Sequence, residues 1–214
     1  VTGEYYDSDV LDEIGRDVIL RPDISTCRLV PWYDEPTAQI IHDAVHQDGA
    51  NVTFSSRAVL KSVLALFDEA GLEPVIAPEL EFFLVKQSSD ANAPLITPPG
   101  RSGRAEKARQ AYGIDAVNEF DPLFEEIYDH CDVQGLDIDT LSHEAGAAQM
   151  EINFNHGHAL DLADQAFLFK RTVRQAAINH HLHATFMAKP MQEQPGSAMH
   201  VHVSVKSKAS GNNI

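Results

Sequence analysis

Basic residues are scarce in this chain of 214 residues: 16 lysines and arginines stand against 32 aspartates and glutamates, which gives a formal net charge of −16. This balance argues against nucleic acid and anionic membranes as partners. Only two cysteines occur, Cys27 and Cys131; they form no close-spaced pair and suggest no disulfide framework. We therefore expect a reducing cytoplasm. No apolar run is long enough to predict a membrane span, and we expect no secretory signal.

Three segments alternate polar with apolar residues, as strands with two unlike faces do. Their polar faces carry Glu79 and Glu81, then Gln149, Glu151 and Asn153, then His200, His202 and Ser204. Their other faces carry Leu80 and Phe82, then Met150, Ile152 and Phe154, then Val201, Val203 and Val205. We expect the three strands to share one curved sheet, with the apolar faces against a core and the polar faces around one cavity.

Several carboxylates in one cavity require either cations or bound protons. Oxygen ligands with one or two imidazoles favour Mg²⁺ or Mn²⁺ over zinc, which prefers thiolate and histidine. A further acid, Glu144, stands with Glu151 on either side of Gly146, a residue that lets the backbone turn tightly beside a ligand. The sequence therefore predicts a metal site for a highly charged substrate.

Each segment also has an ordinary interpretation when it is taken alone. Two acids at alternate positions are typical of a wet strand face, the glycine fits a surface hairpin, and strand histidines are often half-buried. The basic run at residues 101–109 is typical of a solvated loop. His180, His181 and His183 are interpreted as solvated residues at a helix end rather than as zinc ligands.

Apolar residues recur at helical spacing and predict a helix over residues 56–70 that ends at Gly71; they are Val59, Leu60, Val63, Leu64 and Phe67. Further predicted elements are a strand over 75–85, a helix from Asp121-Pro122 to Gly135, a helix over 162–183 and a strand over 198–205. Short β-like runs at 17–20, 26–30 and 39–42 precede them, and residues 90–114 form a long loop. This alternation indicates an α/β or α+β catalytic domain.

Four motifs in series resemble the glutamine synthetase family: Glu79-x-Glu81-Phe82-Phe83, Glu144-x-Gly146-x-x-Gln149-x-Glu151, Ala184-Thr185-Phe186-Met187-x-Lys189-Pro190 and Gly196-Ser197-x-Met199-His200-x-His202-x-Ser204. The resemblance extends over essentially the whole chain. The Gly196–His200 and Glu151–Phe154 runs, with the proline-rich loop, are most similar to the branch that joins glutamate to polyamines or other amines, the γ-glutamylpolyamine synthetases.

The resemblance implies an α+β fold: part of a glutamine-synthetase-type catalytic domain over residues 50–214, with a curved antiparallel sheet and helices outside. Before it, residues 1–49 would be the end of a small β-grasp-like domain. The implied reaction is ATP-dependent ligation of ammonia or an amine to the γ-carboxylate of glutamate through γ-glutamyl phosphate. The implied assembly is a homo-oligomeric ring, a dodecamer, in the cytoplasm.

The same resemblance assigns roles to nine residues. Glu81, Glu144 and Glu151 would hold one Mg²⁺ or Mn²⁺ near glutamate, and Glu79 and His200 would hold a second on the ATP phosphates. The nucleotide would contact Asp139, His202 and Ser204, and the backbone of Gly196 would hold glutamate. No catalytic acid or base is identified in the chain.

The sequence departs from the family at Pro195, where an asparagine is usual, although amine-joining relatives also carry proline there. We also expect the chain to be an incomplete central portion of a synthetase that has little activity alone. A non-catalytic homologue that acts as a scaffold or regulatory subunit is the main alternative. A metal hydrolase built on His200 and His202 is a further one, which the oxygen-rich ligand set disfavours.

Overall fold

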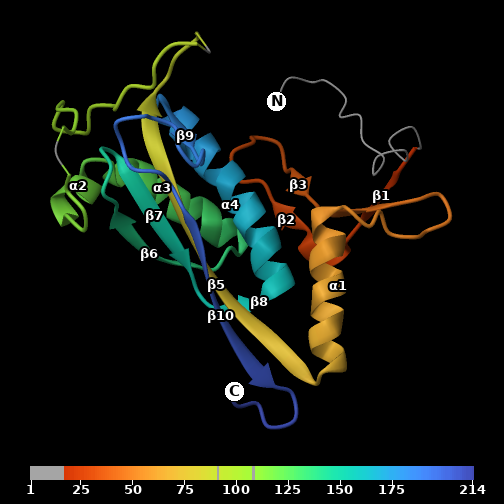
Figure 1. Cartoon of the computed structure of the whole chain (residues 1–214). Coiled ribbons are helices and arrows are strands. Elements are labelled where there is room, and N and C mark those ends of the chain that lie inside the picture. Colours follow the sequence, from red (N-terminus) through yellow and green to blue (C-terminus); the bar gives the residue numbers. More distant parts are fainter. Residues whose placement is uncertain (1–16, 91, 108) are drawn as a thin grey trace.

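The computed structural model describes residues 17–90, 92–107 and 109–214 (Figure 1). Residues 1–16 of the expected N-terminal domain lie outside this part. The first described elements are short: strand β1 (Ile19–Pro22), the 3-10 helix η1 (Ile24–Thr26), and strands β2 (Arg28–Leu29), β3 (Ala38–Gln39) and β4 (His42–Val45). Strands β1 and β4 form one antiparallel pair, and β2 and β3 form another.

A larger antiparallel sheet is built around β5 (Leu72–Lys86), a strand of 15 residues. Its main order is β10–β5–β7–β6, and two more short strands, β8 and β9, also pair with β5. The partner strands are β6 (Ile138–His143), β7 (Gln149–Phe154), β8 (Gly157–His158), β9 (Leu182–Thr185) and β10 (Met199–Ser207). This open antiparallel sheet with helices beside it confirms the expected α+β fold.

The helices of the described part are α1 (Ser56–Glu69), α2 (Ile114–Asn118), α3 (Asp121–Gln134) and α4 (Ala159–Asn179). Helices α3 and α4 lie along one side of the sheet (Figure 1). They bury the apolar face of β5 and β7, including Leu80, Phe82 and Ile152, and the rings of Phe154 and Phe169 meet edge to face at 5.3 Å. Each such buried side chain stabilises the fold by about 1.5–3 kcal/mol, so this core fixes which face of the sheet remains for chemistry.

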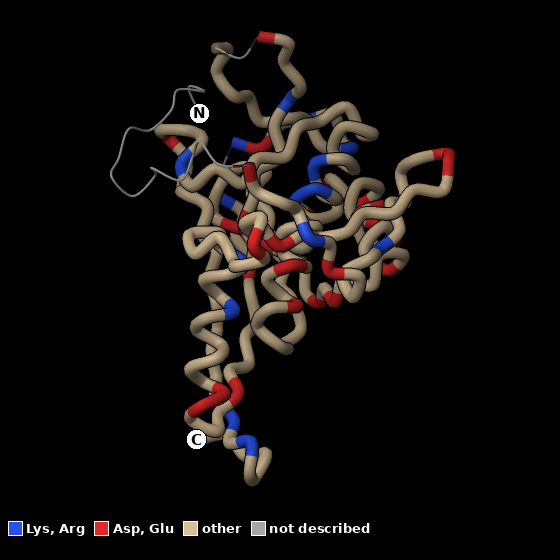
Figure 2. The backbone as a smooth tube through the Cα atoms, turned by 90° about the vertical axis from the view of Figure 1, so that its right-hand side faces the viewer, with Lys and Arg blue, Asp and Glu red and all other residues tan. Residues whose placement is uncertain are grey.

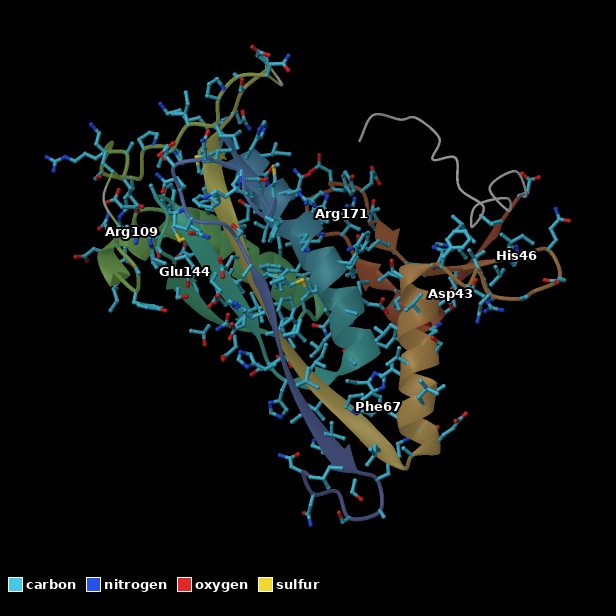
Figure 3. The ribbon with its side chains drawn as sticks, in the orientation of Figure 1. Asp43, His46, Phe67, Arg109, Glu144 and Arg171 are labelled. Carbon is cyan, nitrogen blue, oxygen red and sulfur yellow. The ribbon has the colours of Figure 1, made fainter. Side chains whose placement is uncertain are left out.

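The N-terminal strands are joined to the helices by a charged cluster around Arg57, near the start of α1. Its guanidinium lies 2.7 Å from a carboxylate oxygen of Asp23, 2.7 Å from one of Asp43 and 3.0 Å from one of Asp164 on α4. Lys61 also reaches Asp43, at 2.6 Å. Figure 3 shows Asp43 beside α1. Three segments far apart in the sequence are therefore tied to one side chain.

One expectation about burial is wrong. On β10, Val201 and Val203 are 46% and 62% exposed, although they were expected against the core. Helix α1 has the predicted apolar spacing, and none of its residues is buried. The physical reason is shared: α3 and α4 cover β5 and β7, whereas β10 is at the end of the strand order and α1 lies along the outside of β5 (Figure 1).

Several predicted boundaries also shift. The helix expected over 162–183 begins at Ala159 and ends at Asn179, so His180 is its C-cap and His183 lies on β9. Asp121 is in the first turn of α3 rather than at its N-cap, and Gly135 ends that helix with φ 63°, as predicted. The β-like runs at 26–30 and 39–42 form η1 with β2, and β3 with β4. Local propensity indicates such elements but does not fix their ends.

Acidic residues are distributed along the whole tube in Figure 2, with basic residues interspersed among them. The four cations of the run at 101–109 are exposed, as expected for a solvated loop. Among the described residues, the helices are too short or too polar to cross a membrane.

Candidate metal centre

Three neighbouring strands place their polar side chains on one face of the sheet. Glu81 on β5 is paired with Glu151 on β7, and Glu79 is paired with Asn153 on one side and with His200 of β10 on the other. Residues that oppose each other in an antiparallel pair lie on the same face, about 4.5–5.5 Å apart. The three polar faces therefore meet, while the intervening apolar residues of β5 and β7 enter the core.

Ligand atoms of Glu79, Glu151 and His200 all lie within 4.8 Å of one another. His200 Nδ1 is 3.5 Å from Glu79 Oε2 and 3.9 Å from Glu81 Oε1. Glu81 is buried, Glu79 and Glu151 are half-buried, and His200 is exposed. The cluster thus has a protein wall on the β5 and β7 side and opens to solvent at β10.

Glu144 lies in the connection between β6 and β7 (Figure 3), and its charge acts on Glu151 of the cluster. Burial raises the pKa of its carboxyl, and the nearby charge of Glu81 raises it further. Burial also raises the pKa of Glu151, followed by the charges of Glu144, Glu79 and Glu81, to about 7. The charges of Glu79, Glu81 and Glu144 therefore act on Glu151, which binds a proton more readily than a solvated glutamate does when no cation is present.

The donor set fits a divalent cation that prefers oxygen. Four carboxylates and one imidazole match the ligand chemistry of Mg²⁺ or Mn²⁺. Asn153, opposite Glu79, has a buried side-chain oxygen that receives no hydrogen bond in the described structure. An acceptor left in this way suits a cation or a bound ligand. The site therefore has both the charge and the spare acceptor that a metal would use.

A buried glutamine connects this cluster to the loop that follows β9. The Gln149 amide nitrogen donates to Glu81 Oε2 at 3.0 Å and to the carbonyl of Gly196 at 2.9 Å. Its amide oxygen accepts from Gly146 N at 2.9 Å. A Cβ at Gly146 would lie 2.6 Å from the ring of Phe83, so this approach requires glycine. Gln149 thereby fixes both a candidate metal ligand and the predicted glutamate-binding loop.

The family model for the glutamine synthetase catalytic domain matches residues 53–214. This chain belongs to the glutamine synthetase family. Among curated relatives, it is 37% identical over 177 residues to γ-glutamylputrescine synthetase PuuA of Escherichia coli, covering 81% of this chain and 37% of the relative. It is 35% identical over 210 residues to glutamine synthetase of Halobacterium salinarum, covering 95% of this chain and 44% of the relative.

A solved structure described as a GmaS complex with ADP superimposes with a TM-score of 0.77 at 28% identity. The match covers 92% of this chain and 43% of that one. The chain thus spans less than half the length of the relatives it matches. The family and its fold are shown, and the match extends over every segment that contributes to the cluster.

The other predicted residues of this synthetase-family site lie at different distances from the cluster. His202 contacts the cluster directly, because its Nε2 lies 2.8 Å from Glu79 Oε1. Ser204 is exposed further along β10, opposite Val75. Asp139 is exposed on β6, two strands from β5, where Thr140 donates to its carboxylate. The predicted ATP contacts thus run along and across the sheet and do not form one group.

Two residues near the site were not predicted, Glu106 and Gln194. Glu106, from the long loop, contacts His143 and the amide of Ala148, and Gln194 accepts from the amide of Ala147 at 3.1 Å. Glu106 and Gln194 lie in irregular segments without periodicity, so the sequence gives no signal for their direction. Glu106 is half-buried although its basic neighbours are exposed.

We predict that the metal-free chain becomes less stable as the pH rises from 4.5 to 7. The folded state raises the pKa of Glu151 from 4.5 to about 7, so it binds a proton more tightly than the unfolded chain does. The resulting stabilisation is complete below pH 4.5 and is lost as the pH passes 7. After allowance for solvent screening, it amounts to about 1–2 kcal/mol.

Urea unfolding of the metal-free chain at these two pH values, with and without the substitution Glu151→Gln, measures this effect. The neutral amide does not titrate, so the variant is expected to lose this part of the pH dependence. An equal pH dependence in both proteins would contradict the assignment of the raised pKa to Glu151.

Proposed function

We propose that this chain is part of an ATP-dependent ligase that joins the γ-carboxylate of glutamate to an amine through γ-glutamyl phosphate. The observation that carries the proposal is the convergence of Glu79, Glu151 and His200 within 4.8 Å, inside the segment that matches the catalytic domain. Identity of 37% to a γ-glutamylputrescine synthetase supports an amine as acceptor. Pro195, in place of the usual asparagine, supports the same choice.

Two divalent ions, Mg²⁺ or Mn²⁺, would be held by this face of the sheet. Glu81, Glu144 and Glu151 would hold one ion near glutamate, and Glu79 with His200 would hold the other on the ATP phosphates. Glu151 lies close to both Glu79 and His200, which supports a placement of the two ions next to each other. When bound, the ions would neutralise the two anionic substrates and align the phosphoryl group with its acceptor.

The protein groups around the ions would orient the substrates. Gln149 holds the carbonyl of Gly196, and this contact would fix the backbone that receives glutamate. His202, Ser204 and Asp139 would contact the nucleotide. Because His202 shares Glu79 with the proposed phosphate-side ion, its imidazole would orient that carboxylate before ATP arrives. Orientation of this kind is a large part of the rate enhancement available to a ligase.

The proposal extends to the setting of the enzyme. The ligase would act in the cytoplasm as a homo-oligomeric ring, a dodecamer, with glutamate, ATP and an amine or ammonia as its small-molecule partners. Alone, this chain would bind divalent ions but have little turnover.

Phosphate release by the gene product that contains this chain tests the reaction. Release is expected only when ATP, glutamate and an acceptor are all present, and it is expected to be faster with putrescine or another alkyl amine than with ammonia. Omission of glutamate is the control for simple ATP hydrolysis. If the protein binds Mn²⁺ but releases no phosphate with any acceptor, the scaffold alternative replaces the ligase.

A further inference from the structure

Glu106 belongs to an exposed loop, but its side chain is buried beside the connection between β6 and β7. Its side chain is 6% exposed and that of its partner, His143, is 0% exposed. Glu106 Oε2 lies 2.9 Å from His143 Nε2 and accepts the backbone N–H of Ala148 at 2.7 Å. The other ring nitrogen, His143 Nδ1, lies 2.6 Å from the carbonyl of Glu144.

These contacts join the two ends of the β6–β7 connection. His143 is the last residue of β6, and Ala148 directly precedes β7, so one carboxylate spans the turn that carries Glu144. Within that turn the Glu144 N–H also donates to the carbonyl of Gln149 at 2.7 Å. The Glu144 backbone is thus held at both its N–H and its carbonyl.

Ala148 has φ 54°, a conformation that is unfavourable for a residue with a Cβ. It persists only where neighbouring groups hold it. Its N–H is held by Glu106, and its carbonyl accepts from the N–H of Leu84 on β5 at 2.9 Å. Removal of the Glu106 contact would leave Ala148 held on one side only, and the turn could relax to a different path.

Attachment of the loop alone does not require a buried carboxylate. The same loop is already tied by backbone hydrogen bonds, such as Arg101 N to the carbonyl of Glu119 at 2.9 Å and Tyr112 N to the carbonyl of His143 at 2.8 Å. Burial of a charged group is costly unless the group is paired. Among the described residues, the side-chain hydrogen bonds and ion pair of Glu106 are with the two ends of the turn, which points to a role for that turn.

We propose that Glu106 is a positioning residue for the candidate metal ligand Glu144, acting through His143 and the Ala148 amide. The inference rests on the proposed function, because it takes Glu144 to hold a divalent ion. Glu106 is not a ligand itself. It sets the direction from which the Glu144 carboxylate reaches the ion, as partners that orient metal ligands do.

Three substitutions separate geometry from charge. Glu106→Asp keeps the charge but is one methylene too short to reach both partners, and Glu106→Ala removes both contacts. Both are expected to weaken Mn²⁺ binding by roughly 10–100-fold. Glu106→Gln can accept from Ala148 N and donate to a neutral His143, so it is expected to stay within about twofold of the unsubstituted chain.

Isothermal titration with Mn²⁺ and amide hydrogen exchange at Ala148 measure the two halves of the proposal. Faster exchange at Ala148 is expected in Glu106→Asp and Glu106→Ala but not in Glu106→Gln. Asp164→Asn, which weakens the ion-pair cluster around Arg57, is the control for lost stability, and it is expected to leave Mn²⁺ affinity unchanged in the folded protein.

The outcomes separate this inference from the proposed function. Unchanged Mn²⁺ affinity and unchanged Ala148 exchange in Glu106→Asp would overturn the positioning role while leaving the ligase intact. If Glu106→Ala does not fold, Glu106→Asp decides the matter. Failure of the unsubstituted chain to bind Mn²⁺ would overturn the metal centre, and the role of Glu106 toward it as well.

Discussion

Alanine in place of Glu151 is expected to weaken Mn²⁺ binding by more than about 100-fold, since loss of even an outer partner of a metal site costs 10–100-fold. Burial and then three nearby carboxyl groups raise the pKa of Glu151 to about 7. It is also one of the three residues whose ligand atoms lie within 4.8 Å. Isothermal titration of the folded variant measures the change in affinity.

The matched control for Glu151→Ala is Glu73→Ala. Glu73 is on β5, the strand that carries Glu79 and Glu81, but it is paired with Lys206 at the far end of β10. The substitution Glu73→Ala removes one negative charge from the same sheet, at a position outside the cluster. Equal losses in the two variants would indicate a diffuse attraction of cations to an acidic protein, and would remove the basis for a defined site.

Arg57→Ala is expected to lower the free energy of unfolding by about 3 kcal/mol, the lower end of the range for breaking a buried ion pair, because the Arg57 side chain is half-buried and 11% exposed. The substitution leaves Asp23, Asp43 and Asp164 near one another without their shared guanidinium. Hydrogen bonds from Ser25 and then from Arg57 hold the pKa of Asp23 at about 2. Burial opposes ionisation of Asp43, but Lys61 and Arg57 outweigh it and lower its pKa.

Guanidinium unfolding followed by circular dichroism and by tryptophan fluorescence measures this loss. The single tryptophan, Trp32, reports on the N-terminal segment, whereas circular dichroism reports mainly on the helices. Arg101→Ala is the control, because Arg101 and Asp121 are exposed and 3.9 Å apart, and such pairs contribute about 0–1 kcal/mol. A similar loss of unfolding free energy in both arginine variants would contradict the stabilising role of the ion-pair cluster around Arg57.

The sequence was sufficient to predict which polar residues of the strands share one face of the sheet. Alternation in β5, β7 and β10 indicated which residues share a face, and the observed register places Glu81 opposite Glu151 and Glu79 opposite His200. The end of α3 was also predicted correctly, because Gly135 adopts a left-handed conformation that favours glycine. These features follow from local backbone geometry, which a single sequence carries.

The contacts that support the site could not be predicted in this way. Glu106 lies in a loop whose neighbouring residues are basic and exposed, and only the path of the chain turns it toward His143. The burial of Val203 was also mispredicted, since an apolar strand face tends to be covered but its sequence does not show what covers it. Tertiary placement decides both cases.

Strand β5 carries Glu79 and Glu81 on one face and Leu80 and Phe82 on the other, and it pairs with four other strands. Deletion of one residue from its middle would exchange these faces over the rest of the strand. Two negative charges would enter the hydrocarbon interior, and two large apolar groups would occupy the candidate metal centre. An insertion or deletion within this strand therefore keeps the two faces in place only when it involves an even number of residues. The length of β5 is thus constrained as well as its sequence.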